Sequence, residues 1–149
     1  MTRVKRMTVV QKVVDDRESH QAVQLGLSQR RVTEAESKLG ELQRYETDYR
    51  EAFTRRGKTG DSSLGLRDFQ VFLARLGEAI AQQKQVLKRA HAELDAERKR
   101  WQSAVTKASA VRHIVDGWRA DERRAGARRE QHELDERAQR SHNKHTNDH

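Results

Sequence analysis

Residues 66–118 read LRDFQVFLARLGEAIAQQKQVLKRAHAELDAERKRWQSAVTKASAVRHIVDGW, and apolar side chains recur in this stretch at alternating spacings of three and four residues. Only Gln83 and Glu97 interrupt the repeat. Such a period lines the apolar side chains along one side of an α-helix, where they stay in water unless a second helix covers them. The series is Leu66, Phe69, Leu73, Leu76, Ile80, Gln83, Leu87, Ala90, Leu94, Glu97, Trp101, Ala104, Ala108, Val111, Val115 and Trp118.

A second series with the same period precedes the first and begins near the N-terminus. Its apolar members are Val4, Met7, Val14, Leu25, Val32, Ala35, Leu39, Leu42, Tyr49 and Phe53, and its polar gaps are Gln11, Glu18, Gln21, Ser28 and Glu46. An antiparallel register that pairs Phe53 with Phe69 also pairs Val4 with Trp118, so both series end together. We therefore predict an all-α fold in which two long helices form an antiparallel coiled-coil hairpin.

The two series are separated by RGKTGDSS at residues 56–63, whose glycines and small polar residues are typical of a break between helices. Asp61, Ser62 or Ser63 can cap the second helix. We expect one elongated domain over residues 1–149, with a first helix at 1–56, a hinge at 57–65, a second helix at 66–140 that is unpaired beyond about 119, and a disordered tail at 141–149. Gln21 would face Trp101, so the middle of the hairpin should pack less well than its tip.

The composition excludes several classes of protein. The chain is 36% charged with a mean hydropathy of -1.10, which leaves too few apolar residues for a large core. It has no cysteine and therefore no disulfide or thiolate zinc site, so the cytosol is the expected compartment. The apolar stretch Met7 to Val10 is too short for a secretory signal, and no stretch approaches the roughly 20 residues of a membrane-spanning helix. The net charge of +8 favours an acidic partner.

The sequence gives little indication of a catalytic or metal-binding site. Gly57-Lys58-Thr59 resembles the end of a phosphate-binding loop, but Ala52 stands where that motif needs a glycine and no strand precedes it. A tail that carries His142, His145 and His149 without carboxylate or thiolate support is a poor metal site. We predict no metal, no cofactor and no enzymatic activity. After Arg119 basic and acidic residues nearly balance, which favours a solvated helix over a nucleic-acid groove.

Two aromatic residues lie beside the apolar seam, which is the stripe of contacts formed by the two series. In the heptad assignment Tyr45 falls on the flank of the first helix and Phe72 on the facing flank of the second, so they should adjoin, with Ala79 and Val86 continuing the strip. They either widen the local core or form a docking patch, since clustered exposed aromatics usually mark an interface.

Three motifs resemble the flagellar export protein FliJ, and the likeness spans almost the whole chain. They are Tyr45-x-x-x-Tyr49, Phe69-x-x-Phe72-x-x-x-Leu76-x-x-Ala79-Ile80-x-x-Gln83 and Glu130-Gln131-x-x-Leu134-Asp135-Glu136-x-Ala138. The resemblance implies an antiparallel coiled coil similar in shape to the central stalk of rotary ATPases. It also implies a soluble component of type III export that binds and stimulates the hexameric export ATPase FliI, contacts the export gate FlhA and escorts export chaperones. Such a protein is cytoplasmic and peripheral to the inner membrane through its partners.

The resemblance also assigns residues to these contacts. The partner-facing set matches Leu42, Tyr45, Tyr49, Phe72, Leu76, Ala79 and, at its polar edge, Gln83. The family often has Gln and His where this chain has Lys38 and Gln83. By similarity with rotary stalks, contacts with the ATPase ring fall to Arg3, Lys5, Arg6, Arg123, Arg124 and Arg128. The alternatives are the equivalent stalk of a virulence-type secretion system, a generic structural coiled coil and a basic nucleic-acid binder.

Overall fold

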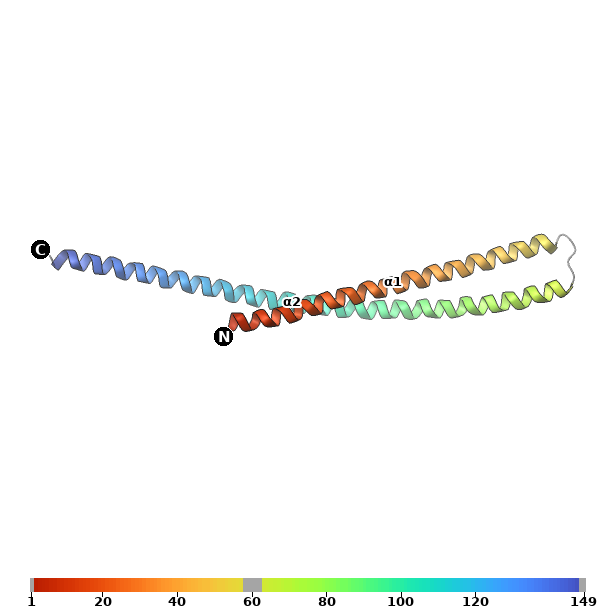
Figure 1. Ribbon diagram of the computed structural model, residues 1–149, viewed down its shortest axis with the longest axis horizontal. Coiled ribbons are helices and arrows are strands. Elements are labelled where there is room, and N and C mark those ends of the chain that lie inside the picture. Colours follow the sequence, from red (N-terminus) through yellow and green to blue (C-terminus); the bar gives the residue numbers. More distant parts are fainter. Residues whose placement is uncertain (1, 58–62, 148–149) are drawn as a thin grey trace. The chain divides into compact units, whose positions relative to one another are not determined.

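The computed structural model describes residues 2–57 and 63–147, and it consists of two long helices (Figure 1). Helix α1 spans Arg3–Gly57 and has 55 residues, and helix α2 spans Ser63–Asn147 and has 85 residues. The two helices pack together as a hairpin, which confirms the predicted all-α fold. Residues 58–62 lie outside the described residues, and with them lie the proposed caps Asp61 and Ser62 and most of the Gly57-Lys58-Thr59 motif.

The chain divides into two compact units, and each contains a piece of both helices. The tip unit comprises Ser19–Ser103, and the terminal unit comprises Met1–Glu18 together with Ala104–His149. The sequence does not indicate this division, because the apolar series of both helices run through it.

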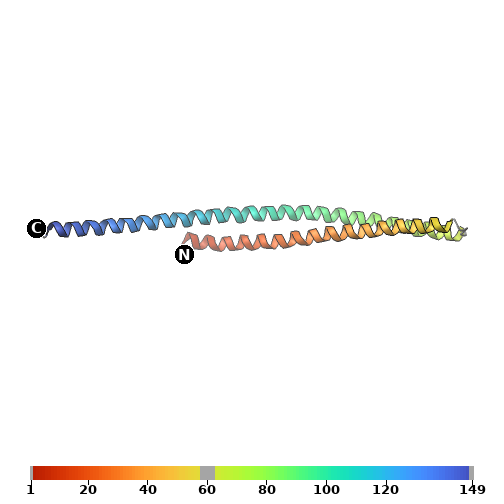
Figure 2. The same ribbon diagram turned by 90° about the horizontal axis from the view of Figure 1, so that it is seen from above.

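The tip unit is built on the predicted seam. Its helices run side by side in both views (Figures 1 and 2), and its buried apolar residues are Val32, Ala35, Leu76, Ile80 and Leu94. All five belong to the two heptad series, whose positions point most directly at the opposite helix.

Side-chain contacts in the tip unit agree with the predicted antiparallel register. The rings of Phe53 and Phe69 stack with their centroids 3.7 Å apart. Further along, the guanidinium of Arg31 lies 2.9 Å from the carboxylate of Glu93. The register predicted from the two series is therefore confirmed at both positions.

In the terminal unit, too, the two helices pack against each other. Ala108 and Val115 of α2 are fully buried, and Arg112 of α2 lies 3.3 Å from the carboxylate of Asp15 on α1. The guanidinium of Arg3 lies 4.4 Å from the centroid of the Trp118 ring. These contacts agree with the predicted proximity of the N-terminus of α1 to Trp118.

The ends of α2 differ from those expected. The helix begins at Ser63 instead of residue 66, and it continues to Asn147 instead of ending at 140, so residues 141–147 are helical where a disordered tail was expected. Thr146 donates its hydroxyl to the carbonyl of His142 at 3.1 Å within this last part. Extension of an existing helix gains one backbone hydrogen bond per residue without any tertiary contact, which is why a polar sequence can continue it. No residue of 119–147 is buried.

The polar residues in the seam behave in two ways. Gln83 is buried and donates its side-chain amide to the carbonyl of Ala35 at 3.1 Å, so it completes the packing. In contrast, Gln21 Oε1 and Glu97 Oε2 are buried without a hydrogen-bond partner among the described residues. Gln21, where weaker packing was expected, therefore has an unsatisfied oxygen, whereas the polar seam residue Gln83 is fully accommodated.

Neither described helix contains a stretch long and apolar enough to cross a membrane.

Candidate partner-binding site

Five aromatic residues of the tip unit form a continuous cluster between α1 and α2. Tyr49 stacks on Phe69 at a centroid distance of 5.2 Å and lies 4.3 Å from the ring of Phe72. Phe53 extends the stack through Phe69, and Tyr45 extends it through Phe72. Tyrosine and phenylalanine occur here on facing heptad positions, so each helix supplies alternate rings. The cluster links the seam to the surface.

Tyr45 and Phe72 form the outer end of this cluster. Their rings meet edge to face with centroids 6.0 Å apart, which confirms the predicted contact. Tyr45 is 56% exposed, whereas Phe72 is half-buried because its other side packs on Tyr49. The two readings of these aromatics are therefore compatible, since Phe72 widens the core and Tyr45 remains accessible to a partner.

The other residues of the predicted partner-facing set occupy different depths. Leu42 and Ala79 are half-buried, and Leu76 and Gln83 are each only 7% exposed. Leu76 is a core residue, and the Gln83 amide is held by the Ala35 carbonyl. These two support the surface from below, while Tyr45, Phe72 and Ala79 form its accessible part.

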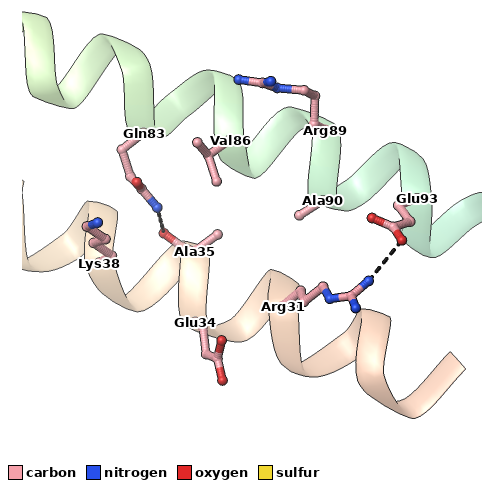
Figure 3. A pocket seen from close by; sticks show the side chains of 9 residues that line it. All are labelled: Arg31, Glu34, Ala35, Lys38, Gln83, Val86, Arg89, Ala90 and Glu93. Atoms are coloured by element: carbon pink, nitrogen blue, oxygen red, sulfur yellow. Dashed lines mark hydrogen bonds and ion pairs between the residues drawn. The ribbon is translucent and has the colours of Figure 1, made fainter. Parts of the chain in front are cut away.

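A groove of about 520 Å³ lies in the same unit, between α1 and α2 (Figure 3). Its lining residues are Arg31, Glu34, Ala35, Lys38, Gln83, Val86, Arg89, Ala90 and Glu93. The hydrogen bond from Gln83 to Ala35 crosses between the helices, and the ion pair of Arg31 with Glu93 crosses further along (Figure 3).

The groove and the exposed aromatics belong to one flank of the helix pair. Lys38 and Arg31 precede Tyr45 at seven-residue intervals on α1, and Val86 and Glu93 continue from Phe72 at the same interval on α2. Sequence reasoning identified Val86 but missed Arg31, Arg89 and Glu93. The seven-residue spacing was the signal that would have found Arg31 and Glu93.

The charge of this flank favours an acidic or polar partner. Three cations, Arg31, Lys38 and Arg89, line the groove with two carboxylates, Glu34 and Glu93. One cation and one carboxylate already neutralise each other in the Arg31–Glu93 pair. The remaining cations outnumber the remaining carboxylate, and exposed charges of this kind steer and select a partner more than they stabilise the complex.

The six basic residues expected to contact an ATPase ring all lie exposed in the terminal unit. Arg3, Lys5 and Arg6 are in the first turns of α1, and Arg123, Arg124 and Arg128 lie on α2 beyond Trp118. Arg124 lies 2.5 Å from the carboxylate of Asp121. The structure thus brings the six residues into one unit but distributes them over two helices.

The histidines expected to be poor metal ligands lie at the end of α2. His142 and His145 are exposed, and His149 lies outside the described residues. Within residues 2–57 and 63–147, no three His, Cys, Asp or Glu side chains are grouped so as to hold a metal ion.

Comparison with known proteins gives one clear result. No curated protein and no solved structure matches the chain. The family model of the flagellar FliJ protein matches residues 3–147, which is nearly the whole chain. Members of that family are structural components of flagellar export, and the family is not a catalytic one. The chain, an all-α hairpin with an aromatic cluster in its tip unit, belongs to the FliJ family of flagellar export proteins.

Proposed function

We propose that this protein binds the export ATPase FliI, stimulates ATP hydrolysis by its hexameric ring, contacts the export gate FlhA and escorts export chaperones. The observation that carries the proposal is the family match over residues 3–147. The proposal assigns these contacts to the two surfaces described above, one in each unit.

The proposed gate-binding surface is the tip strip, which consists of Tyr45, Phe72, Ala79 and Val86. Tyr45 and Val86 are exposed, and the charged groove with Lys38 adjoins them. An exposed tyrosine supported by a fixed phenylalanine loses little conformational entropy on binding, and such residues are typical anchors of protein interfaces. The groove would then contribute selectivity through its cations.

The proposed ATPase-binding surface is the basic set Arg3, Lys5, Arg6, Arg123, Arg124 and Arg128 in the terminal unit. A single helix pair has no sixfold symmetry, so it contacts the six subunits of a ring unequally. Unequal binding favours one arrangement of subunits over others and shifts the population of ring states. The protein can therefore stimulate hydrolysis without touching a nucleotide.

The same proposal implies a cellular location. A protein that acts on an ATPase and a gate of the export apparatus works in the cytoplasm, at the inner face of the inner membrane. Its association with the membrane would be peripheral and would depend on these partners.

The test is ATP hydrolysis by the cognate export ATPase with and without the full-length protein. We expect a higher rate with the protein and no increase with a variant in which Arg3, Lys5 and Arg6 are replaced by glutamine. A matched variant, with the exposed tip-unit residues Arg30, Lys84 and Arg98 replaced by glutamine, loses the same charge and should still stimulate. An unchanged rate with the intact protein would contradict the proposal.

A further inference from the structure

The terminal unit has an exposed apolar surface that the proposed contacts leave unused. Val9, Val10 and Val13 of α1 and Ile114 of α2 are between 41% and 59% exposed. All four belong to one compact unit, and none is a member of either heptad series. Large aliphatic side chains that gather on an exposed surface mark an interaction site more often than isolated ones do.

Helical geometry places Val10 and Ile114 on one flank of the helix pair, and Val13 and Val9 successively further out on the surface of α1. Val9 and Val13 are four residues apart and Val10 and Val13 are three apart, so the three valines are neighbours on the surface of α1. The Asp15–Arg112 ion pair and the contact of Arg3 with Trp118 determine the register of the two helices. In that register Val10 and Ile114 occupy facing flank positions, so the apolar surface extends from α1 onto α2.

Arginines border this surface on α1. Arg3 and Arg17 lie seven residues before and after Val10 on the same flank, and Arg6 lies one turn before both Val9 and Val10. Of the nearby acidic residues, Asp15 pairs with Arg112 on the opposite flank and Glu18 is a half-buried member of the seam. Asp16 adjoins the surface beyond Val13. On α2, Lys107 and Asp121 lie seven residues before and after Ile114 on the same flank, and Asp121 is paired with Arg124. The rim of the apolar surface is therefore predominantly basic.

We propose that Val9, Val10, Val13 and Ile114 form a docking surface for an acidic amphipathic helix of a partner protein. The flank between two packed helices is a shallow furrow into which a third helix can lay its apolar stripe lengthwise. Glutamate or aspartate beside that stripe would meet Arg3, Arg6 and Arg17. A second copy of this chain would instead bring the same arginines together, which is unfavourable.

This inference goes beyond the proposed function because its four aliphatic residues belong neither to the tip strip nor to the six basic residues, although its rim shares Arg3 and Arg6 with the latter. It also makes no use of ATP hydrolysis. Its experiment therefore gives a result whether or not the protein stimulates an ATPase.

The experiment is fluorescence anisotropy with the full-length protein and a labelled synthetic helix of about 20 residues, with leucine at heptad positions a and d and glutamate elsewhere. We expect saturable binding that weakens as salt is added. The matched probe has lysine in place of every glutamate and should not bind. Equal binding of both peptides, or binding of neither, would overturn the proposal.

Single substitutions locate the binding surface. We expect Val10→Glu and Val13→Glu each to weaken binding of the glutamate peptide at least about fivefold, because each removes an apolar contact and places a like charge against the peptide. The control is Val23→Glu, which changes a valine of α1 that is 61% exposed in the tip unit and should leave binding unchanged. Circular dichroism should show equal helix content in all three variants. An equal loss of binding in Val23→Glu would contradict the assigned location.

The arginine rim is tested separately. The double variant Arg6→Gln with Arg17→Gln should bind the glutamate peptide more weakly and with a smaller dependence on salt. Sedimentation of the unlabelled protein tests whether a second copy of the chain occupies the surface instead. Self-association that is abolished by Val13→Glu would assign the surface to that second copy and overturn the proposal. Binding of anionic vesicles that requires the same valines would overturn it in favour of lipid.

Discussion

At the scale of single residues, the two outer aromatics differ in role: Phe72 packs within the cluster, and Tyr45 is exposed. Phe72 contacts both Tyr49 in the seam and Tyr45 at the surface, whereas Tyr45 is more than half exposed. A substitution at Tyr45 therefore separates binding from stability better than a substitution at Phe72. Leu73, a half-buried seam residue next to Phe72, provides the contrast.

Tyr45→Ala should weaken binding to the cytoplasmic domain of the export gate about tenfold while lowering the free energy of unfolding by less than about 1 kcal/mol. Phe72→Ala should weaken binding similarly with nearly intact helix content. Calorimetric titration measures the affinity, and thermal denaturation followed by circular dichroism measures stability. Leu73→Asp is the control that should unfold the tip, because it puts a charge into the seam. A melting temperature for Tyr45→Ala as low as that for Leu73→Asp would show that Tyr45 is a core residue.

The buried polar oxygens in the seam lead to a second prediction at the scale of single residues. Gln21 Oε1 and Glu97 Oε2 have no hydrogen-bond partner among the described residues, although both residues lie in the seam. Replacing Gln21 by leucine should raise the free energy of unfolding by about 1 kcal/mol, because it removes an unsatisfied buried oxygen and adds apolar contact, whereas the other oxygen of Glu97 is paired with Arg100. Denaturation in urea measures the change. Gln83→Leu is the comparison and should gain less, since that amide is already bonded to the Ala35 carbonyl.

At the scale of elements, α2 is an 85-residue helix whose first part packs against α1 and whose last part is exposed. Its first part supplies the seam, and no residue of 119–147 is buried. The last part is stabilised by backbone hydrogen bonds and by pairs within the helix, such as Arg140 with Glu136 at 3.5 Å. Pairs of this kind on an exposed helix contribute only about 0.3–0.5 kcal/mol each.

A chain that ends after Ala120 should therefore keep its melting temperature within about 2 °C of the intact protein. The removed segment contains Arg123, Arg124 and Arg128, so stimulation of the export ATPase should fall. Calorimetry and the hydrolysis assay measure the two effects. A large loss of thermal stability would mean that residues 121–147 pack on the rest of the chain.

At the scale of the whole molecule, stability should vary along the chain according to burial. The fully buried residues of α2 are Ala108 and Val115 in the terminal unit, and the seam of the tip unit buries Leu76, Ile80 and Leu94. Local opening of a helix exposes its amides most readily where few side chains are buried. The aliphatic surface of the terminal unit does not alter this order, since its residues are exposed.

Hydrogen exchange measured by mass spectrometry should therefore be slowest in peptides that cover the two buried groups and fastest within 119–147. Peptides around Gln21 and Glu97 should exchange faster than those around Ile80, because their polar atoms are unsatisfied. Protection of 119–147 equal to that of the tip unit would contradict the division of α2 into packed and exposed parts. Addition of the export ATPase should slow exchange in 119–147 if this segment binds it.

The amino-acid sequence by itself determined the all-α hairpin, its register and the contact of Tyr45 with Phe72. These follow from a heptad repeat, which is local information written along each helix. Only the tertiary structure decided how deeply each partner-facing residue lies, because burial depends on what the opposite helix covers. Leu76 and Gln83 are core residues on that ground, and the groove with Arg31 and Glu93 exists because two helices meet there. The helical end of α2 was also missed, since its residues carry neither a seam nor a strong cap, and the structure extends the helix through Asn147.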